Sequence, residues 1–168
     1  TKELQSTLCV HAGAVHCIAI RPDGKILASG GADHTIKIWD LGNSEVQQTL
    51  EGHTDAVHAL TFSPSGQFLI SGSADHTIKI WDLENKTLLY TLNGHSGAVH
   101  SIAINAQGDL LMSGSADKTV KIWHPSSGKP LYTLCDHSAG VMAVAIHSDT
   151  GKIASGSQDK TIKIWQFD

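Results

Sequence analysis

A repeat of 42 residues sets the strongest limit on what this chain can fold into. Its clearest copy is SADHTIKIWD at 73–82, and the other copies are GADHTIKIWD at 31–40, SADKTVKIWH at 115–124 and SQDKTIKIWQ at 157–166. Equivalent positions lie 42 residues apart, which divides the 168 residues into four units, roughly 1–42, 43–84, 85–126 and 127–168. A fixed period between about 20 and 50 residues is typical of stacked units that cannot bury their apolar surface alone.

One unit predicts one small sheet. After Gly52 the second copy runs VHALTF, QFLISGS, TIKIWD and TLLYTL, and the intervening stretches SPSG, ADH and LENK are rich in turn-forming residues. Four short β-rich runs without helical periodicity favour a four-stranded antiparallel meander. Ile78 and Ile80 alternate with Lys79 and Trp81, so both faces carry apolar residues and need cover from neighbouring units. We therefore expect an all-β chain of stacked four-stranded sheets.

Two departures from the repeat carry local expectations. Gly151 comes one position later than the period predicts from Gly24, Gly66 and Gly108, which predicts a longer turn and a shorter second strand in the last unit. The three cysteines, Cys9, Cys17 and Cys135, lie in apolar runs without metal-binding spacing. They are interpreted as small buried residues of a protein in a reducing compartment, the cytoplasm.

The charge balance excludes several classes of partner. The formal net charge is −4, and charged residues are spread without runs, so no nucleic-acid or membrane surface is expected. Apolar stretches stay well short of a membrane span, and residues 1–8 do not have the pattern of a signal peptide. The absence of an initiating methionine suggests a processed or excised chain.

The paired residues at the two ends of each unit resemble the WD-repeat β-propeller family. The Gly-His pair occurs at Gly52–His53 and Gly94–His95, and the Trp-Asp pair occurs at Trp39–Asp40 and Trp81–Asp82. The other copies depart from these pairs, reading WH at 123–124 and WQ at 165–166. The resemblance spans the whole chain and implies a propeller with four four-stranded blades per chain.

The same resemblance implies a hydrogen-bond tetrad in every blade. The tetrad would join a histidine before the first strand, a serine of the second strand, the aspartate of the following turn and the tryptophan of the third strand. The four sets are His11, Ser29, Asp33 and Trp39; His53, Ser71, Asp75 and Trp81; His95, Ser113, Asp117 and Trp123; and His137, Ser155, Asp159 and Trp165. A serine, histidine and aspartate could also form a nucleophilic triad. Their fourfold recurrence with a tryptophan, without a GxSxG elbow, favours a structural role in a chain that is not an enzyme.

Two further rows of residues recur with the repeat. His16, His58 and His100 each follow the tetrad histidine by five residues, with Met142 in the fourth place. They would either line a polar channel mouth or meet around a divalent metal, and we expect no cofactor. The second row consists of lysines two residues before each tryptophan, Lys37, Lys79, Lys121 and Lys163. Their stems are expected to lie along the sheet with the ammonium groups in water.

The order of the strands raises the question of ring closure. Residues 5–10 look like an outer strand without a blade of its own, and the last unit ends at its third strand. The resemblance implies that such an N-terminal strand completes the last blade. Two chains arranged head to tail would give an eight-bladed ring, so we predict a homodimer. The rival arrangement is a longer chain whose other blades finish the ring.

The predicted function is a scaffold for protein–protein interaction. The resemblance implies that partners dock on the face where the loops before the first strands and the turns before the third strands open. On that face the candidate contact residues are His16, His58, His100, Met142 and Gln158. The expected partners are a second copy of the chain and an unidentified protein or peptide. Two alternatives are a structural, amplified repeat without a dedicated partner and a metal-binding or hydrolytic site at the channel mouth.

Overall fold

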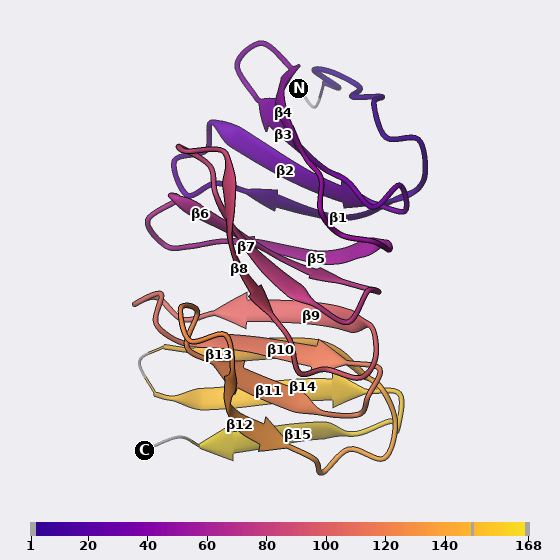
Figure 1. Ribbon diagram of the computed structural model, residues 1–168, viewed down its shortest axis with the longest axis vertical. Coiled ribbons are helices and arrows are strands. Elements are labelled where there is room, and N and C mark those ends of the chain that lie inside the picture. Colours follow the sequence, from indigo (N-terminus) through magenta and orange to yellow (C-terminus); the bar gives the residue numbers. More distant parts are fainter. Residues whose placement is uncertain (1–2, 149, 167–168) are drawn as a thin grey trace.

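The chain folds into four antiparallel sheets that are stacked one on another (Figure 1). The computed structural model describes residues 3–148 and 150–166. The first sheet contains β1 (Val15–Ile20), β2 (Ile26–Gly31), β3 (Ile36–Asp40) and β4 (Glu45–Leu50). The second contains β5 (Val57–Phe62), β6 (Phe68–Ser73), β7 (Ile78–Asp82) and β8 (Thr87–Leu92). The third contains β9 (Val99–Ile104), β10 (Leu111–Ser115), β11 (Val120–Trp123) and β12 (Pro130–Leu134), and the last contains β13 (Val141–His147), β14 (Lys152–Ser157) and β15 (Ile162–Gln166).

Each sheet is a meander in which consecutive strands pair, and the pairing repeats from one sheet to the next. Ile36 pairs with Leu50 and Lys37 with Thr49, and the same pairs occur 42 residues later, between Ile78 and Leu92 and between Lys79 and Thr91. The all-β blade architecture expected from the repeat is therefore present. First strands of neighbouring sheets lie side by side, β1 against β5 and β5 against β9.

The hydrophobic core lies between the sheets. Ile36 and Ile38 project from β3 into a cluster that also contains Val57, Leu69 and Trp81 of the second sheet. In the next interface Ile78 and Ile80 take the same places. The alternation along TIKIWD thus directs isoleucines to the following sheet and tryptophan to the preceding one. Full burial of one such side chain stabilises the fold by about 1.5–3 kcal/mol.

Glycines of the second strands allow neighbouring sheets to approach closely. A Cβ added to Gly30 would lie 2.7 Å from Val57 Cγ1, and one added to Gly72 would lie 2.7 Å from Val99 Cγ1. Gly114 stands in the same relation to Val141. In the last sheet, a Cβ added to Gly156 would lie no closer than 4.0 Å to its first non-adjacent neighbour, the Ala143 Cβ. The first three second-strand glycines therefore leave space for the valine that begins the first strand of the next sheet, and the equivalent space beside Gly156 is empty.

The stack is open at both ends. At one end Val15 and Ile18 of β1 are 52% and 63% exposed, and at the other Ile162 and Ile164 of β15 are 76% and 71% exposed. Figure 1 shows the N-terminal segment beside the first sheet, at the opposite end of the stack from β15. The described part of the chain thus forms four sheets that do not close into a ring.

The expectation of an outer strand at residues 5–10 is not met in this chain. Residues 3–14 form no strand and run past the first sheet, where the Ser6 and Ser44 hydroxyl oxygens lie 3.3 Å apart. In the described residues the last sheet accordingly has three strands. A strand needs the edge of another strand to satisfy its backbone groups, and the edge of β15 lies at the far end of the stack.

Two smaller expectations also require correction. In the last unit β14 has six residues, as β2 and β6 have, whereas β13 has seven and only four residues separate it from β14, against five between β1 and β2. The expected longer turn and shorter second strand are therefore both wrong, because the first strand continues one residue into the turn. Cys9 and Cys135 are exposed, because one lies in the unpaired N-terminal segment and the other follows the outermost strand β12. Cys17 is half-buried, and burial raises the pKa of its thiol to about 12.

Candidate interaction face

A chain of hydrogen bonds ties two loops to the centre of each sheet. In the second sheet His53 Nδ1 lies 2.7 Å from Asp75 Oδ2, and His53 Nε2 lies 2.7 Å from Ser71 Oγ. The indole Nε1–H of Trp81 donates to the same Ser71 Oγ over 2.8 Å. His53 precedes β5, Ser71 belongs to β6, Asp75 lies in the turn after β6, and Trp81 belongs to β7. One network therefore joins the loop before the first strand, the turn before the third strand and the sheet itself.

The other sheets repeat this network, and the last sheet differs in the contact that its tryptophan makes. The histidine–aspartate contact is 3.0 Å in the first sheet, 2.6 Å in the third and 2.7 Å in the last. Trp39 and Trp123 donate to Ser29 and Ser113 as Trp81 does to Ser71. In the last sheet His137 contacts Ser155 over 2.7 Å, and the half-buried ring of Trp165 packs edge-on against His137 at 6.1 Å. The structure thus brings together the residues of each expected set.

The turn aspartate accepts more hydrogen bonds than the expected tetrad contains. Asp75 also accepts from the backbone N–H of Thr54 and from both the N–H and the hydroxyl of Thr77. Burial tends to raise the pKa of Asp75, but hydrogen bonds from Thr77 and His53 outweigh burial and lower it to about 2. The threonine was not among the expected residues. Its recurrence two positions after each turn aspartate, at 35, 77, 119 and 161, is the signal that identifies it.

The protonation of the network follows from its donors. Burial lowers the pKa of His53, and the hydrogen bond to Asp75 opposes that shift. A neutral His53 can donate from Nδ1 to the Asp75 carboxylate and accept at Nε2 from the Ser71 hydroxyl, while Ser71 Oγ accepts from Trp81. Every member then has a partner. Among the described residues, no buried side-chain nitrogen or oxygen is left without one.

The connectivity is that of a nucleophilic triad, but the surroundings are not those of an active site. Ser71 and Ser113 are fully buried, and each Oγ is occupied by a tryptophan N–H. A nucleophile must be reachable by its substrate and must have an oxygen free to attack. The tetrads therefore hold loops in place, which gives the edge of the stack a fixed backbone.

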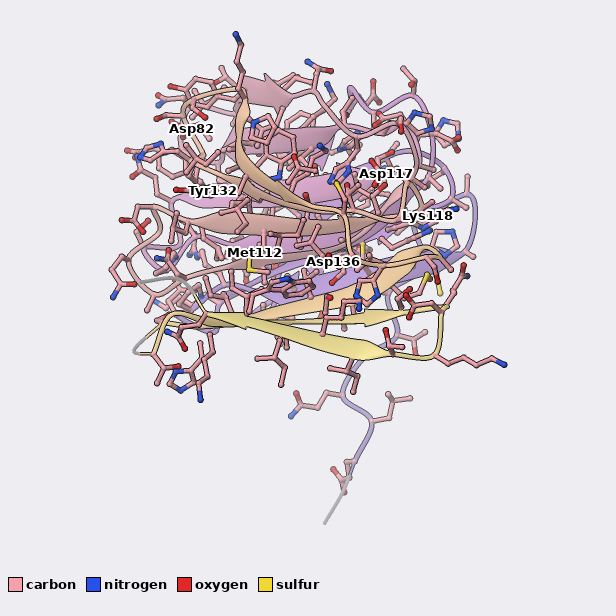
Figure 2. All side chains as sticks on the ribbon, turned by 90° about the horizontal axis from the view of Figure 1, so that it is seen from below. Asp82, Met112, Asp117, Lys118, Tyr132 and Asp136 are labelled. Carbon is pink, nitrogen blue, oxygen red and sulfur yellow. The ribbon has the colours of Figure 1, made fainter. Side chains whose placement is uncertain are left out.

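Figure 2 gives the position of this face. Asp117 and Lys118, in the turn between β10 and β11, lie towards one side of the stack, while Asp82, at the end of β7, lies on the opposite side. His34, His76, Lys118 and Lys160, which follow the turn aspartates, are all exposed and have left-handed backbones with φ between 66° and 72°. This row of basic or titratable side chains was not anticipated, although its spacing of 42 residues is visible in the sequence.

Four of the five expected contact residues lie near the start of the first strands β1, β5, β9 and β13. The imidazole centroids of His16 and His58 are 5.1 Å apart, and those of His58 and His100 are 5.5 Å apart. Burial lowers the pKa of His58, and the neighbouring His100 and His16 lower it further. Met142 takes the fourth place on β13 and is 42% exposed. In the turn after β14 the Gln158 N–H donates to the Gly140 carbonyl over 2.9 Å, which fixes that backbone beside β13.

The histidine row does not form a metal centre. Within the part of the chain that the structure describes, no three or more histidine, cysteine, aspartate or glutamate side chains are grouped so that they could hold an ion. The row is instead a stack of imidazoles along the inner strands. The metal-binding alternative for the channel mouth is therefore not supported.

Comparisons with known proteins relate the whole chain to one propeller family. The family profile described as the WDR3 first β-propeller domain matches residues 1–167. Shorter similarities occur to the small ribosomal subunit protein RACK1 of Medicago sativa, 49% identical over 39 residues, and to the Notchless protein homolog of Arabidopsis thaliana, 54% identical over 35 residues. These segments cover 23% and 21% of this chain, but only 12% and 7% of the two relatives. No helix among the described residues has the length and hydropathy to cross a membrane.

Proposed function

Because the chain belongs to the β-propeller family described by the first propeller domain of WDR3, we propose that it is a non-enzymatic scaffold for protein–protein interaction. The observation that carries this proposal is the closed set of hydrogen bonds in the tetrads. Their serines, histidines and aspartates are engaged with one another and with tryptophan, so they position loops and leave no group for chemistry. A rigid set of loops binds a partner with little loss of conformational entropy.

The docking surface is the face at the tetrad end of the stack. Its inner part carries His16, His58, His100 and Met142, and Gln158 lies in the turn beside them. Its outer part carries exposed turn residues such as Lys118 and Lys160. A partner protein or peptide would lie across several sheets at once, since each sheet contributes a single turn of similar shape. The cytoplasm is the proposed compartment, supported by the similarity to a small ribosomal subunit protein.

A ring completed by a second copy is the proposed assembly. Four sheets per chain and two apolar ends support an eight-bladed homodimer in which each end covers the opposite end of the other copy. Exposed apolar ends and unpaired strand edges favour association. Light scattering on a sizing column should give twice the chain mass of 17.8 kDa. A mass of one chain at all concentrations would refute the ring.

The scaffold proposal is tested by comparing capture by matched variants. We expect the combined substitution His58→Ala, His100→Ala and Gln158→Ala to lower the recovery of specific partners at least tenfold relative to the unaltered chain. The control is Leu89→Ala on the outer strand β8, which should recover the same partners as the unaltered chain. Equal recovery by the face variant and the unaltered chain would refute the proposed docking surface.

A further inference from the structure

The second residue of every first strand lies at a β-bulge. Where β1 pairs with β2, the register shifts between Val15 and Cys17, so His16 has no partner of its own on β2. The same shift falls on the equivalent residues of the other first strands, which are His58, His100 and Met142. A bulge turns the side chain of its extra residue out of the regular alternation, and bulges often occur beside binding sites. The backbone therefore presents this position in the same way four times.

The three histidines at these bulges, His16, His58 and His100, have ring nitrogens that the protein leaves unused. In the part of the chain that the structure describes, their imidazoles contact one another but make no hydrogen bond. A tetrad histidine differs, because it contacts an aspartate with one ring nitrogen and a serine with the other. Ring nitrogens without a partner in the protein can bond to a ligand.

The spacing of the sheets brings these imidazoles into a row. The strands β1, β5 and β9 follow one another down the stack (Figure 1), and the ring centroids of successive sheets are 5.1 and 5.5 Å apart. His16 is exposed, and His58 and His100 are half-buried. Beside His58 the Ala74 N–H donates to the Ala56 carbonyl over 2.9 Å, and neither alanine has a long side chain to cover the rings. A ligand can therefore reach the row.

The row has no strong counter-charge of its own. Burial lowers the pKa of His58, His100 and His16 lower it further, and Asp55 opposes these shifts. The Asp55 carboxylate is engaged within its loop, where Oδ1 accepts a backbone N–H over 2.7 Å and lies 4.0 Å from His34 Nε2. Adjacent protonated rings repel one another, and a nearby anion favours the charged form of each. An anion from outside the chain would therefore stabilise the protonated row.

The turns around the row add positive charge to the same face. Each sheet contributes one exposed basic or titratable residue directly after its turn aspartate, and these are His34, His76, Lys118 and Lys160. The turn aspartates themselves are engaged in hydrogen bonds, as Asp75 is with His53 and Thr77. Although the formal net charge of the chain is −4, this face is suited to a negatively charged ligand.

We propose that the row of His16, His58 and His100 binds an acidic segment of a partner protein, with carboxylates accepting hydrogen bonds from the imidazole N–H groups. The inference rests on the proposed function and names the chemistry of the partner at that docking surface. Alternate residues of an extended segment lie about 7 Å apart, so flexible glutamate side chains can each meet one ring. Nucleic acids are held mainly by arginine and lysine contacts to phosphate, which the row does not offer.

Binding should strengthen as the pH falls. A free imidazole has a pKa of about 6.5 and a free glutamate one of about 4.3, so between about pH 7.5 and about pH 5.5 the rings gain protons while the glutamates stay charged. A carboxylate that binds the protonated rings more tightly than the neutral ones promotes proton uptake, and by reciprocity proton uptake promotes its binding.

The test measures the fluorescence anisotropy of rhodamine-labelled hexaglutamate titrated with the full chain. EDTA in every sample excludes a bridging metal ion, and labelled hexaglutamine serves as the uncharged control. We expect the dissociation constant of hexaglutamate to fall at least tenfold between about pH 7.5 and about pH 5.5, with no binding of hexaglutamine. A dissociation constant that does not change with pH would overturn the inference. Tighter binding of a labelled six-nucleotide DNA would overturn the assignment to carboxylates.

Matched variants separate the row from the general charge of the chain. The combined substitution His58→Gln and His100→Gln removes two imidazoles of the row and should weaken binding at pH 5.5 at least tenfold. The control, His124→Gln and His147→Gln, removes two exposed imidazoles at the other ends of their strands and should bind as the unaltered chain does. Both variants change the net charge equally, so equal weakening would overturn the site.

A third variant adds a ring and does not rely on a loss. Met142 occupies the fourth bulge and is 42% exposed, so Met142→His extends the row by one imidazole. Its affinity for hexaglutamate at pH 5.5 should rise at least threefold, and an unchanged or lower affinity would overturn the row as the binding surface. Urea midpoints of all variants should match that of the unaltered chain, because the tetrads are intact.

The outcomes distinguish this inference from the proposed function. Absence of hexaglutamate binding at every pH would overturn the acidic ligand and leave the scaffold, which is tested by the capture of partners. Equal capture by the face variant and the unaltered chain would refute the docking surface, and with it the place of the row in docking, even if hexaglutamate binds.

Discussion

Replacing Ser113 by alanine tests the tetrad most directly, because one hydroxyl serves two buried partners. Ser113 Oγ accepts from the Trp123 indole N–H over 2.8 Å and lies 2.7 Å from His95 Nε2, and both Ser113 and Trp123 are fully buried. Ser113→Ala leaves an indole donor and an imidazole nitrogen without partners. Each unpaired buried group costs about 1–3 kcal/mol, so with partial relaxation the free energy of unfolding should fall by about 2–4 kcal/mol.

The matched control is Ser155→Ala in the last sheet. Ser155 contacts His137 over 2.7 Å, while the half-buried Trp165 packs on the histidine ring, so one buried partner is lost and about 1–2 kcal/mol is expected. Urea titrations followed by tryptophan fluorescence, at one fixed protein concentration, give both values. Equal losses for the two variants, or a loss below about 1 kcal/mol for Ser113→Ala, would refute the assignment of the serine as the shared acceptor.

Three further outcomes follow from the same structure. Gly72→Ala should destabilise the chain by about 1–3 kcal/mol through overpacking, because its methyl group would lie 2.7 Å from Val99 Cγ1, whereas Gly156→Ala in the monomer should leave the urea midpoint unchanged. Acidification should lower the free energy of unfolding as the pH falls below 6.5, because the pKa of His53 is lowered in the folded chain and the unfolded chain therefore binds the proton first. A further loss is expected below pH 3.8, as the pH approaches the Asp75 pKa of about 2. Urea titrations at several pH values measure both losses, and a rise in stability towards pH 5 would contradict the expectation for His53. Thr91→Val removes the acceptor of the Lys79 ammonium at a buried lysine, so thermal unfolding should show a loss of about 1.5–3 kcal/mol; a loss below about 0.5 kcal/mol would contradict a role of this hydrogen bond in stability.

The sheets and the tetrads could be predicted because both depend on spacing within one repeat. His53, Ser71, Asp75 and Trp81 come from consecutive elements of a single meander, so the period alone brings them to one place. The resemblance to the propeller family supplied the hydrogen-bond pattern, which periodicity by itself does not contain. The direction of Ile78 and Ile80 to one interface, and of Trp81 to the other, followed from strand alternation.

Contacts between repeats and the behaviour of the ends were harder to predict. The fit of Val99 against Gly72 depends on how closely two sheets approach, which no pattern within a repeat reports. Residues 5–10 have the composition of a strand, but a strand forms only where an edge is available, and in one chain that edge lies at the far end of the stack. The exposure of Cys9 and Cys135 has a similar cause, since apolar neighbours in sequence do not ensure cover in space.

The two ends of the stack, with Val15 and Ile18 exposed at one and Ile162 and Ile164 at the other, also carry a risk during assembly. If the end of one chain joins the start of another without the rotation that closes the pair, a third chain can add in the same way, and growth becomes linear and unlimited. Closure competes with this growth because the two remaining ends of a joined pair meet at a high effective concentration that does not depend on dilution. If the proposed ring forms, low protein concentration therefore favours closed pairs, and high concentration favours open-ended chains of copies.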